Sequence, residues 1–199
     1  MVKRVGHIID IADDQELNND EALYRRSFGK DQSAAEKLVE RYGDSLTFYV
    51  NGYIHDIRDA EDIMIDAFAL MFVKMRPVGR AGSFKAYLYK TARNLAVRHK
   101  KGRRIFINID DVAFELKNDD KAEADIIRNE RDRQLCGALE RLKTEYQEVL
   151  YLIYFQDMSY REAGAVMGKS ESQVTKLVYR GKQRLKSILE EEGFVYEDD

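Results

Sequence analysis

The 199-residue sequence contains no tryptophan, one proline and one cysteine. A single cysteine, Cys136, excludes an intramolecular disulfide and a zinc site built from several cysteines. No run of about eighteen apolar residues occurs, so we expect no membrane insertion. The N-terminus also lacks the apolar stretch of a secretory signal. These absences predict a soluble protein of the reducing cytoplasm.

Strand-type alternation is scarce as well. Long stretches are rich in Ala, Leu, Glu, Lys and Arg, which favours an all-α fold. An apolar fraction of 44% is enough for one core or two small ones. The three histidines are scattered, and no Ser–His–Asp or Cys–His grouping follows from their spacing. We therefore predict neither an enzyme nor a bound cofactor.

Charge is segregated along the chain. The net charge is −3, which excludes a uniformly basic DNA-binding protein. Between Phe84 and Arg104, however, there are eight Lys or Arg and no acidic residue. Residues 107–125 carry seven acids against two bases, and the last ten residues carry six acids and no base. This pattern suggests that the acidic linker and tail cover the basic helix in the free protein.

Two helix starts lie eleven residues apart near the C-terminus. Ser159 is followed three residues later by Glu162, and Ser170 by Gln173, so each pair predicts a capping box. Gly168 lies between them, where a helix ends with positive φ. We predict a helix near 159–167, a turn at 168–170 and a longer helix from 171, which is the outline of a helix-turn-helix.

The second of these helices carries side chains that can read base edges or hold phosphates, away from its apolar face. The alternative is an ordinary solvated helix face. The residues of this kind are Gln173, Thr175, Lys176, Tyr179, Arg180, Lys182, Gln183 and Arg184.

An acidic helix is predicted over residues 60–75, ended by Pro77. Its carboxylates have no histidine positioned beside them, and an acidic face for a partner protein needs less special geometry than a metal site. Upstream, residues 21–51 predict two helices, with Gly29 and Gly43 as interruptions.

A basic helix is predicted from Phe84 to about residue 100, with Ser83 as its cap. Its aromatic residues alternate with cations and could stack on unpaired bases. We expect Phe84 to lie in the core instead, and for Tyr87 and Tyr89 both interpretations remain open. Further helices are predicted over residues 125–141 and 144–156, which gives two helical modules joined by a linker.

Two stretches resemble one family. "DAEDIMIDAFALMFVKM … GSFKAYLYKTARNLAVRHKKGRR" resembles sigma domain two of the extracytoplasmic-function RNA polymerase sigma factors, and "ALERLKTEYQEVLYLIYFQDMSYREAGAVMGKSESQVTKLVYRGKQRLKSIL" resembles sigma domain four. The resemblance implies an N-terminal extension over residues 1–19, domain two over 20–104, a linker over 105–127, domain four over 128–190 and an acidic tail over 191–199.

The resemblance also implies partners and residue roles. Core RNA polymerase, through its β′ clamp helices and β flap, and promoter DNA are the expected partners, with an anti-sigma factor as a further candidate. The polymerase-binding residues would be Asp59, Glu61, Asp62, Asp66 and Phe68. The helix-turn-helix would read the minus-thirty-five element as duplex, through Ser170, Glu171, Ser172, Gln173, Thr175, Lys176, Tyr179, Arg180 and Lys182. The minus-ten residues would be Arg76, Arg80, Lys85, Tyr87, Tyr89, Lys90, Arg93, Asn94, Arg98, Lys101, Arg103 and Arg104.

Some positions depart from the family pattern. Tyr87 stands where the family usually has tryptophan, Ile65 stands in place of glutamine, and Gly164 stands where alanine is usual. The usual Gly-Thr-Val is replaced by residues 172–174, Ser-Gln-Val. Two other functions remain as alternatives: a stand-alone helix-turn-helix regulator that binds DNA as a dimer, and an interaction module that kept the fold but lost DNA reading.

Overall fold

The structure is a computed structural model, and it describes residues 19–28, 30–74, 83–106, 134–191 and 193. All regular secondary structure in these ranges is helical, which confirms the predicted all-α class. The elements in chain order are α2 (Asp20–Phe28), α3 (Gln32–Ile54), α4 (Ile57–Lys74), α5 (Phe84–Phe106), α7 (Thr144–Leu150), η1 (Tyr151–Phe155), α8 (Tyr160–Met167) and α9 (Glu171–Glu191).

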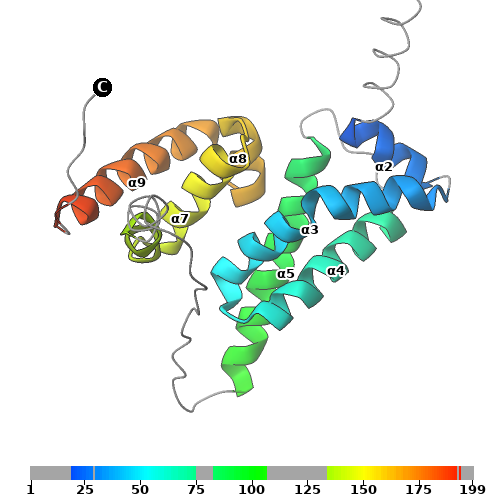
Figure 1. The fold of residues 1–199 in the computed structure, drawn as a ribbon, viewed down its shortest axis with the longest axis horizontal. Coiled ribbons are helices and arrows are strands. Elements are labelled where there is room, and N and C mark those ends of the chain that lie inside the picture. The colour runs from blue at the N-terminus through cyan, green and yellow to red at the C-terminus, as the bar shows by residue number, and fades with distance from the viewer. Residues whose placement is uncertain (1–18, 29, 75–82, 107–133, 192, 194–199) are drawn as a thin grey trace, which may run out of the picture.

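Helices α2 to α5 form the front module (Figure 1). Within it α3 packs on α2, α4 and α5, and α4 packs on α5. The largest fully buried side chains of this module are Tyr24, Tyr89, Phe84, Leu23, Leu38, Leu46, Met71, Leu88 and Val50. Burial of Phe84 confirms its predicted place in the core.

Local signals explain where the front helices begin. The Asp31 side chain caps α3 by accepting from the Ala34 amide at 3.2 Å. Ser83 Oγ accepts from the Ala86 amide at 3.2 Å, which confirms the predicted cap of α5. Helix α5 then runs to Phe106, further than the sequence predicted, and α4 ends at Lys74.

One predicted interruption is wrong. Helix α3 continues through Gly43 without a break. Gly43 lies on the buried side of α3, with Leu46 and Val50 of the same helix in the core. Tertiary packing of an apolar face contributes more to helix stability in proteins than the intrinsic propensity of one residue, so the glycine is tolerated.

The rear module consists of a helical segment over residues 134–140 followed by α7, η1, α8 and α9. The part of the predicted 125–141 helix before residue 134 lies outside the described residues. The helix predicted over 144–156 changes to π-helical geometry from Tyr151, where the Gln156 amide bonds to the Tyr151 carbonyl at 3.1 Å. Such π turns occur frequently at functional sites.

Both predicted capping boxes are confirmed. The Glu162 amide donates to Ser159 Oγ at 3.2 Å, and Glu162 Oε2 accepts from the Ser159 amide at 3.0 Å. The second box, between Ser170 and Gln173, has the same two bonds at 3.3 and 2.8 Å. Gly168 ends α8 with φ of 68°, as the turn requires. The predicted helix-turn-helix is therefore present as α8 and α9.

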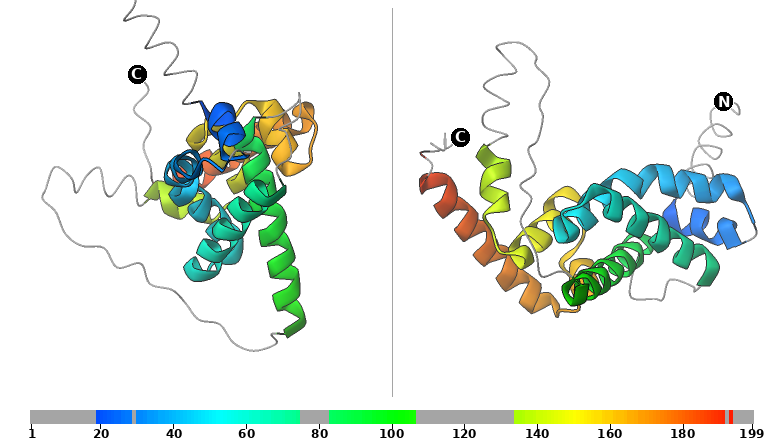
Figure 2. Two further views of the ribbon diagram at one scale, coloured as in Figure 1. Left: turned by 90° about the vertical axis from the view of Figure 1, so that its right-hand side faces the viewer. Right: turned by 90° about the horizontal axis from the view of Figure 1, so that it is seen from below.

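The two modules also contact each other. Helix α8 packs on α5, and α7 packs on α3 (Figures 1 and 2). Buried residues of both modules belong to one hydrophobic cluster. The linker and tail predicted to cover the basic helix lie outside the described residues. In the described part of the chain, no helix is long and apolar enough to cross a membrane.

Gly164 has a steric explanation. A Cβ at this position would lie 2.6 Å from the backbone carbonyl oxygen of Lys169, so the turn between α8 and α9 would have to move. We predict that Gly164→Ala lowers the free energy of unfolding by about 1–3 kcal/mol, although alanine is the better helix former. Urea denaturation followed by circular dichroism measures this change.

Gly52→Ala is the matched control. Gly52 lies in α3, and a Cβ there meets no atom within 4 Å. This substitution should leave stability unchanged or raise it by up to about 1 kcal/mol. Equal stabilisation by both substitutions would contradict the close approach at Gly164.

Candidate functional site

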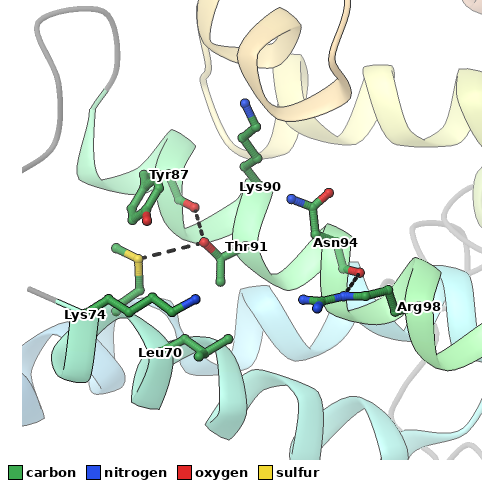
Figure 3. A pocket seen from close by; sticks show the side chains of 8 residues that line it. Leu70, Lys74, Tyr87, Lys90, Thr91, Asn94 and Arg98 are labelled. Carbon is green, nitrogen blue, oxygen red and sulfur yellow. Dashed lines mark hydrogen bonds between the residues drawn. The ribbon is translucent and has the colours of Figure 1, made fainter. Parts of the chain in front are cut away.

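A cationic pocket lies between α4 and α5 (Figure 3). Its described lining includes three cations and no carboxylate. Helix α4 contributes Leu70, Met71 and Lys74, and helix α5 contributes Tyr87, Lys90, Thr91, Asn94 and Arg98.

Helical spacing brings the α5 residues together. Each of these residues lies three or four positions from another of the set, so together they form one stripe along α5. Thr91 Oγ1 donates to the Tyr87 carbonyl at 2.9 Å, and Arg98 Nε donates to the Asn94 carbonyl at 3.2 Å (Figure 3). The first bond anchors the Thr91 hydroxyl to the α5 backbone, and the second holds the Arg98 guanidinium close to α5.

The pocket combines three chemical features. The half-buried ring of Tyr87 offers an aromatic surface, Met71 supplies an apolar floor, and Lys74 and Lys90 are exposed cations. Aromatic rings stack on unpaired bases, and ammonium groups hold the phosphates that link them. The arrangement therefore suits an unstacked nucleotide of a single strand.

Tyr89 does not belong to this surface, and its assignment to DNA binding is corrected. Its side chain is fully buried, and its hydroxyl donates to Ser45 Oγ at 3.0 Å. Burial raises the pKa of Tyr89 well above its ordinary value, so the phenol stays neutral. Residues two apart on a helix point to different sides, so Tyr87 and Tyr89 cannot share one face.

Two further cations of α5 face the rear module instead of the pocket. Lys85 Nζ donates to the Gln156 carbonyl. Arg93 Nε donates to Glu148 Oε1 at 2.7 Å, and the side chain of Glu148 is only 2% exposed. Both cations are therefore engaged within the protein in this conformation.

The remaining predicted minus-ten residues are placed only in part. Lys101 is exposed. Arg103 and Arg104 lie in the last turns of α5, but their side chains are outside the description, and Arg76 and Arg80 lie outside the described residues. Four lining residues were not predicted from the sequence: Leu70, Met71, Lys74 and Thr91. The helical spacing of Leu70, Met71 and Lys74 near the end of the acidic helix was the available signal.

The acidic side of α4 is a second candidate surface. Glu61, Asp62 and Asp66 are exposed, and the exposed apolar side chain of Ile65 lies among them. Asp59 is partly buried and lies 3.7 Å from His99 Nε2. In the described ranges, no group of three His, Cys, Asp or Glu side chains is arranged to hold a metal ion.

Phe68 is corrected from a partner contact to a core residue. Only 3% of it is exposed, and its ring stacks on that of Phe72 at 5.8 Å. Its side chain therefore packs behind the acidic face of α4 and is not part of the exposed surface.

Helix α9 exposes every predicted minus-thirty-five residue. Three of them have local bonds: Ser170 and Gln173 form the capping box, and Thr175 Oγ1 donates to the Glu171 carbonyl at 3.0 Å. Lys182 Nζ lies over the ring of Tyr154 at 5.6 Å.

Three other exposed side chains of α9 are better placed to reach DNA. Lys176, Tyr179 and Arg180 make no side-chain hydrogen bond or ion pair with the described residues. Their steps of three and one place them on adjoining parts of one exposed side. These three are available to a ligand without breaking a local bond.

Comparison with known proteins places both modules in one family. The Sigma-70 region 2 model matches residues 38–105, and the Sigma-70 region 4 model matches residues 133–185. Similar proteins include the ECF RNA polymerase sigma factor BldN of Streptomyces coelicolor, 26% identical over 86% of this chain and 66% of BldN. The RNA polymerase sigma-H factor of Pseudomonas aeruginosa is 23% identical over 86% of this chain and 94% of that protein.

A solved structure agrees in fold. CnrH, in complex with the cytosolic domain of CnrY, has a TM-score of 0.60 at 23% identity and covers 86% of this chain and 97% of CnrH. The chain belongs to the extracytoplasmic-function sigma factors of the sigma-70 family. Proteins of this family are not enzymes; they bind core RNA polymerase and direct it to promoters.

The two tyrosines of α5 allow a direct check of the site. We predict that Tyr89→Ala lowers the free energy of unfolding by about 3–5 kcal/mol, because it empties a fully buried aromatic position. Tyr87→Ala removes a half-buried ring at the pocket and should lower stability clearly less. Thermal or urea unfolding of both variants measures the difference. Equal losses would mean that Tyr87 is a core residue and not a pocket wall.

Proposed function

We propose that this sigma factor opens the minus-ten element with α5 and reads the minus-thirty-five element with α9, while α4 holds the polymerase. The observation that supports this most is the α4–α5 pocket, whose described lining contains Tyr87 and three cations but no carboxylate. Aromatic and cationic side chains are the groups that bind an unpaired base and its phosphate.

The minus-ten step needs an unstacked base. Turning a base out of the stack requires a few kcal/mol, so a pocket must return a similar amount. Stacking on an aromatic side chain supplies about 1–3 kcal/mol per base. We assign stacking to Tyr87, phosphate contacts to Lys74, Lys90 and Arg98, and a base-edge hydrogen bond to Asn94.

The minus-thirty-five step is assigned to the exposed side of α9. The Arg180 guanidinium can bond two acceptors of a guanine in the major groove, and Lys176 can contact a base or a phosphate. Ser170 and Gln173 have a structural role in the cap and contribute less to base reading.

The polymerase partner is assigned by charge. Glu61, Asp62 and Asp66 present three carboxylates around the apolar Ile65, which suits a basic partner with a small apolar contact. We propose the β′ clamp helices as that partner, the β flap as the partner of the rear module, and the cytoplasm as the compartment where all three meet.

A regulatory protein partner belongs to the same proposal. The sigma factor RpoE of Bartonella quintana was solved in complex with the anti-sigma factor NepR, and it has a TM-score of 0.58 with this chain at 20% identity. We propose that an anti-sigma factor also controls this protein.

The DNA-reading role of α9 can be tested by charge reversal. Lys176→Glu and Arg180→Glu should each lower promoter-specific transcription with core polymerase by about tenfold or more, because a good base contact is worth about 1–3 kcal/mol. The measurement is in vitro transcription, with and without core polymerase, on genomic fragments that include the protein's own upstream region.

Lys186→Glu is the matched control. It makes the same charge change on the same helix, about two turns further along α9 from Arg180, and should leave transcription nearly unchanged. Failure of the wild-type protein to support any transcript with an active core enzyme would contradict the proposal. Strong binding to a palindromic operator without polymerase would favour the dimeric regulator.

The polymerase-binding role is tested separately. Asp62→Lys and Asp66→Lys should each weaken capture of core polymerase by the immobilised protein several-fold, because a like charge replaces an attractive one. Glu36→Lys on the exposed side of α3 is the control with the same change of charge. Capture by both α4 variants at the wild-type level would remove α4 from the polymerase interface.

A further inference from the structure

One carboxylate of the rear module is buried against the front module. Glu148 of α7 is 5% exposed, and its oxygens accept bonds from two front-module residues. Tyr49 of α3 donates its hydroxyl to Oε1 at 2.9 Å, and Arg93 of α5 donates Nε to the same oxygen at 2.7 Å. Among the described residues, every hydrogen-bond partner of this carboxylate therefore belongs to the front module.

This pairing links carboxylate burial to contact between the modules. A carboxylate removed from water needs a counter-charge and hydrogen bonds, and loss of one partner from a buried pair is strongly destabilising. Glu148 has this counter-charge and these hydrogen bonds only while α7 lies against α3 and α5. When the modules separate, Glu148 and Arg93 both return to water, so the pair stabilises the closed arrangement specifically.

Further contacts near Glu148 also join the two modules. Ser83 Oγ donates to Glu162 Oε1 at 2.5 Å, and Tyr151 of η1 donates its hydroxyl to the Ser45 carbonyl at 2.8 Å. The Tyr151 ring stacks on the Tyr49 ring at 5.8 Å. The Lys85 ammonium bonds to the Gln156 carbonyl. The rear module thus contacts α3 through α7 and η1, and it contacts α5 through α8 and through the bonds to Lys85 and Arg93.

Lys85 and Arg93, which contact the rear module, are also candidate DNA ligands. The guanidinium of Arg93 forms charge-assisted bonds with carboxylates and phosphates alike. While Arg93 is bonded to Glu148, the same donors are not available to a phosphate. The pocket residues Lys90, Asn94 and Arg98 lie on another side of α5 and stay exposed. The closed arrangement withholds only part of the minus-ten surface.

We propose that Glu148 locks the free protein in a closed state by competing with promoter phosphate for Arg93, and that the modules must separate before α5 binds promoter DNA fully. The competition with DNA rests on the proposed function, whereas the closed state does not. If a ligand binds only the open state, its apparent affinity is reduced in proportion to the fraction of molecules that are open. Polymerase, by holding the modules apart, would remove this penalty.

The test uses the full-length chain with Glu148→Gln. The amide keeps the size of the side chain but removes its charge, so the closed state would bury the Arg93 guanidinium without a counter-ion. Energy transfer between dyes on the native Cys136 and on a cysteine introduced as Gln32→Cys reports module separation, since both positions are exposed. We expect energy transfer to fall in the variant.

The same variant is then tested for DNA binding without polymerase. The probe is a fluorescein-labelled oligothymidylate of about 12 nucleotides, within the range that a single-strand site covers. We expect its affinity to rise about tenfold as the open fraction grows. Glu145→Gln is the matched control, because Glu145 lies on the same helix, is 56% exposed and pairs with Lys169 of its own module at 2.8 Å. It should change neither quantity.

Each outcome decides one part of the proposal. Wild-type energy transfer and affinity in Glu148→Gln would overturn the lock. Lower energy transfer without a gain in affinity would overturn the competition with DNA. Should circular dichroism show that Glu148→Gln does not fold, Tyr49→Phe replaces it, since this change removes the hydroxyl that donates to Glu148 Oε1. A fall in energy transfer with about a threefold gain in affinity is then expected, and wild-type values would overturn the lock.

The proposed function can fail independently of this result. If no transcripts form with core polymerase, the proposed roles of α4, α5 and α9 are contradicted. The change in energy transfer can still be measured, because it needs neither polymerase nor promoter DNA.

Discussion

The structure depends on one constraint, which is that α5 must face three environments at once. Each residue turns the helix by about 100°, so neighbouring positions are sent to different surroundings. Phe84, Leu88 and Tyr89 go to the core, Tyr87 and Lys90 go to the pocket, and residues 85 and 93 meet the rear module. A basic segment that reads as one block in the sequence is therefore divided among surfaces with different functions.

Features specified by local sequence were predictable to within a residue or two. The helix-turn-helix follows from two capping boxes and one glycine, and all their bonds are made within a few residues. The exclusion of Tyr89 from the pocket could also have been predicted, because residues two positions apart on a helix point to different sides. Gly43 was misjudged because its tolerance in α3 comes from packing between helices. The π turn at Tyr151 has no local signal that we could identify.

The contacts between modules could not be predicted, because the partners are far apart in the chain. Glu148 and Arg93 are separated by 55 residues, and neither is unusual where it stands. The sequence suggested that acidic segments cover the basic helix, and those segments lie outside the described residues. The described structure has a different cover, in which a single buried carboxylate and the α8 helix lie against α5.

The central claim is that the pocket side of α5 receives an unstacked base. The most direct measurement places 2-aminopurine in the non-template strand of the minus-ten element, because its fluorescence rises when it leaves the stack. With wild-type protein and core polymerase, the account predicts a rise that Tyr87→Phe retains and Tyr87→Ala largely loses. An equal rise with Tyr87→Ala, or none with an actively transcribing wild-type complex, would contradict it.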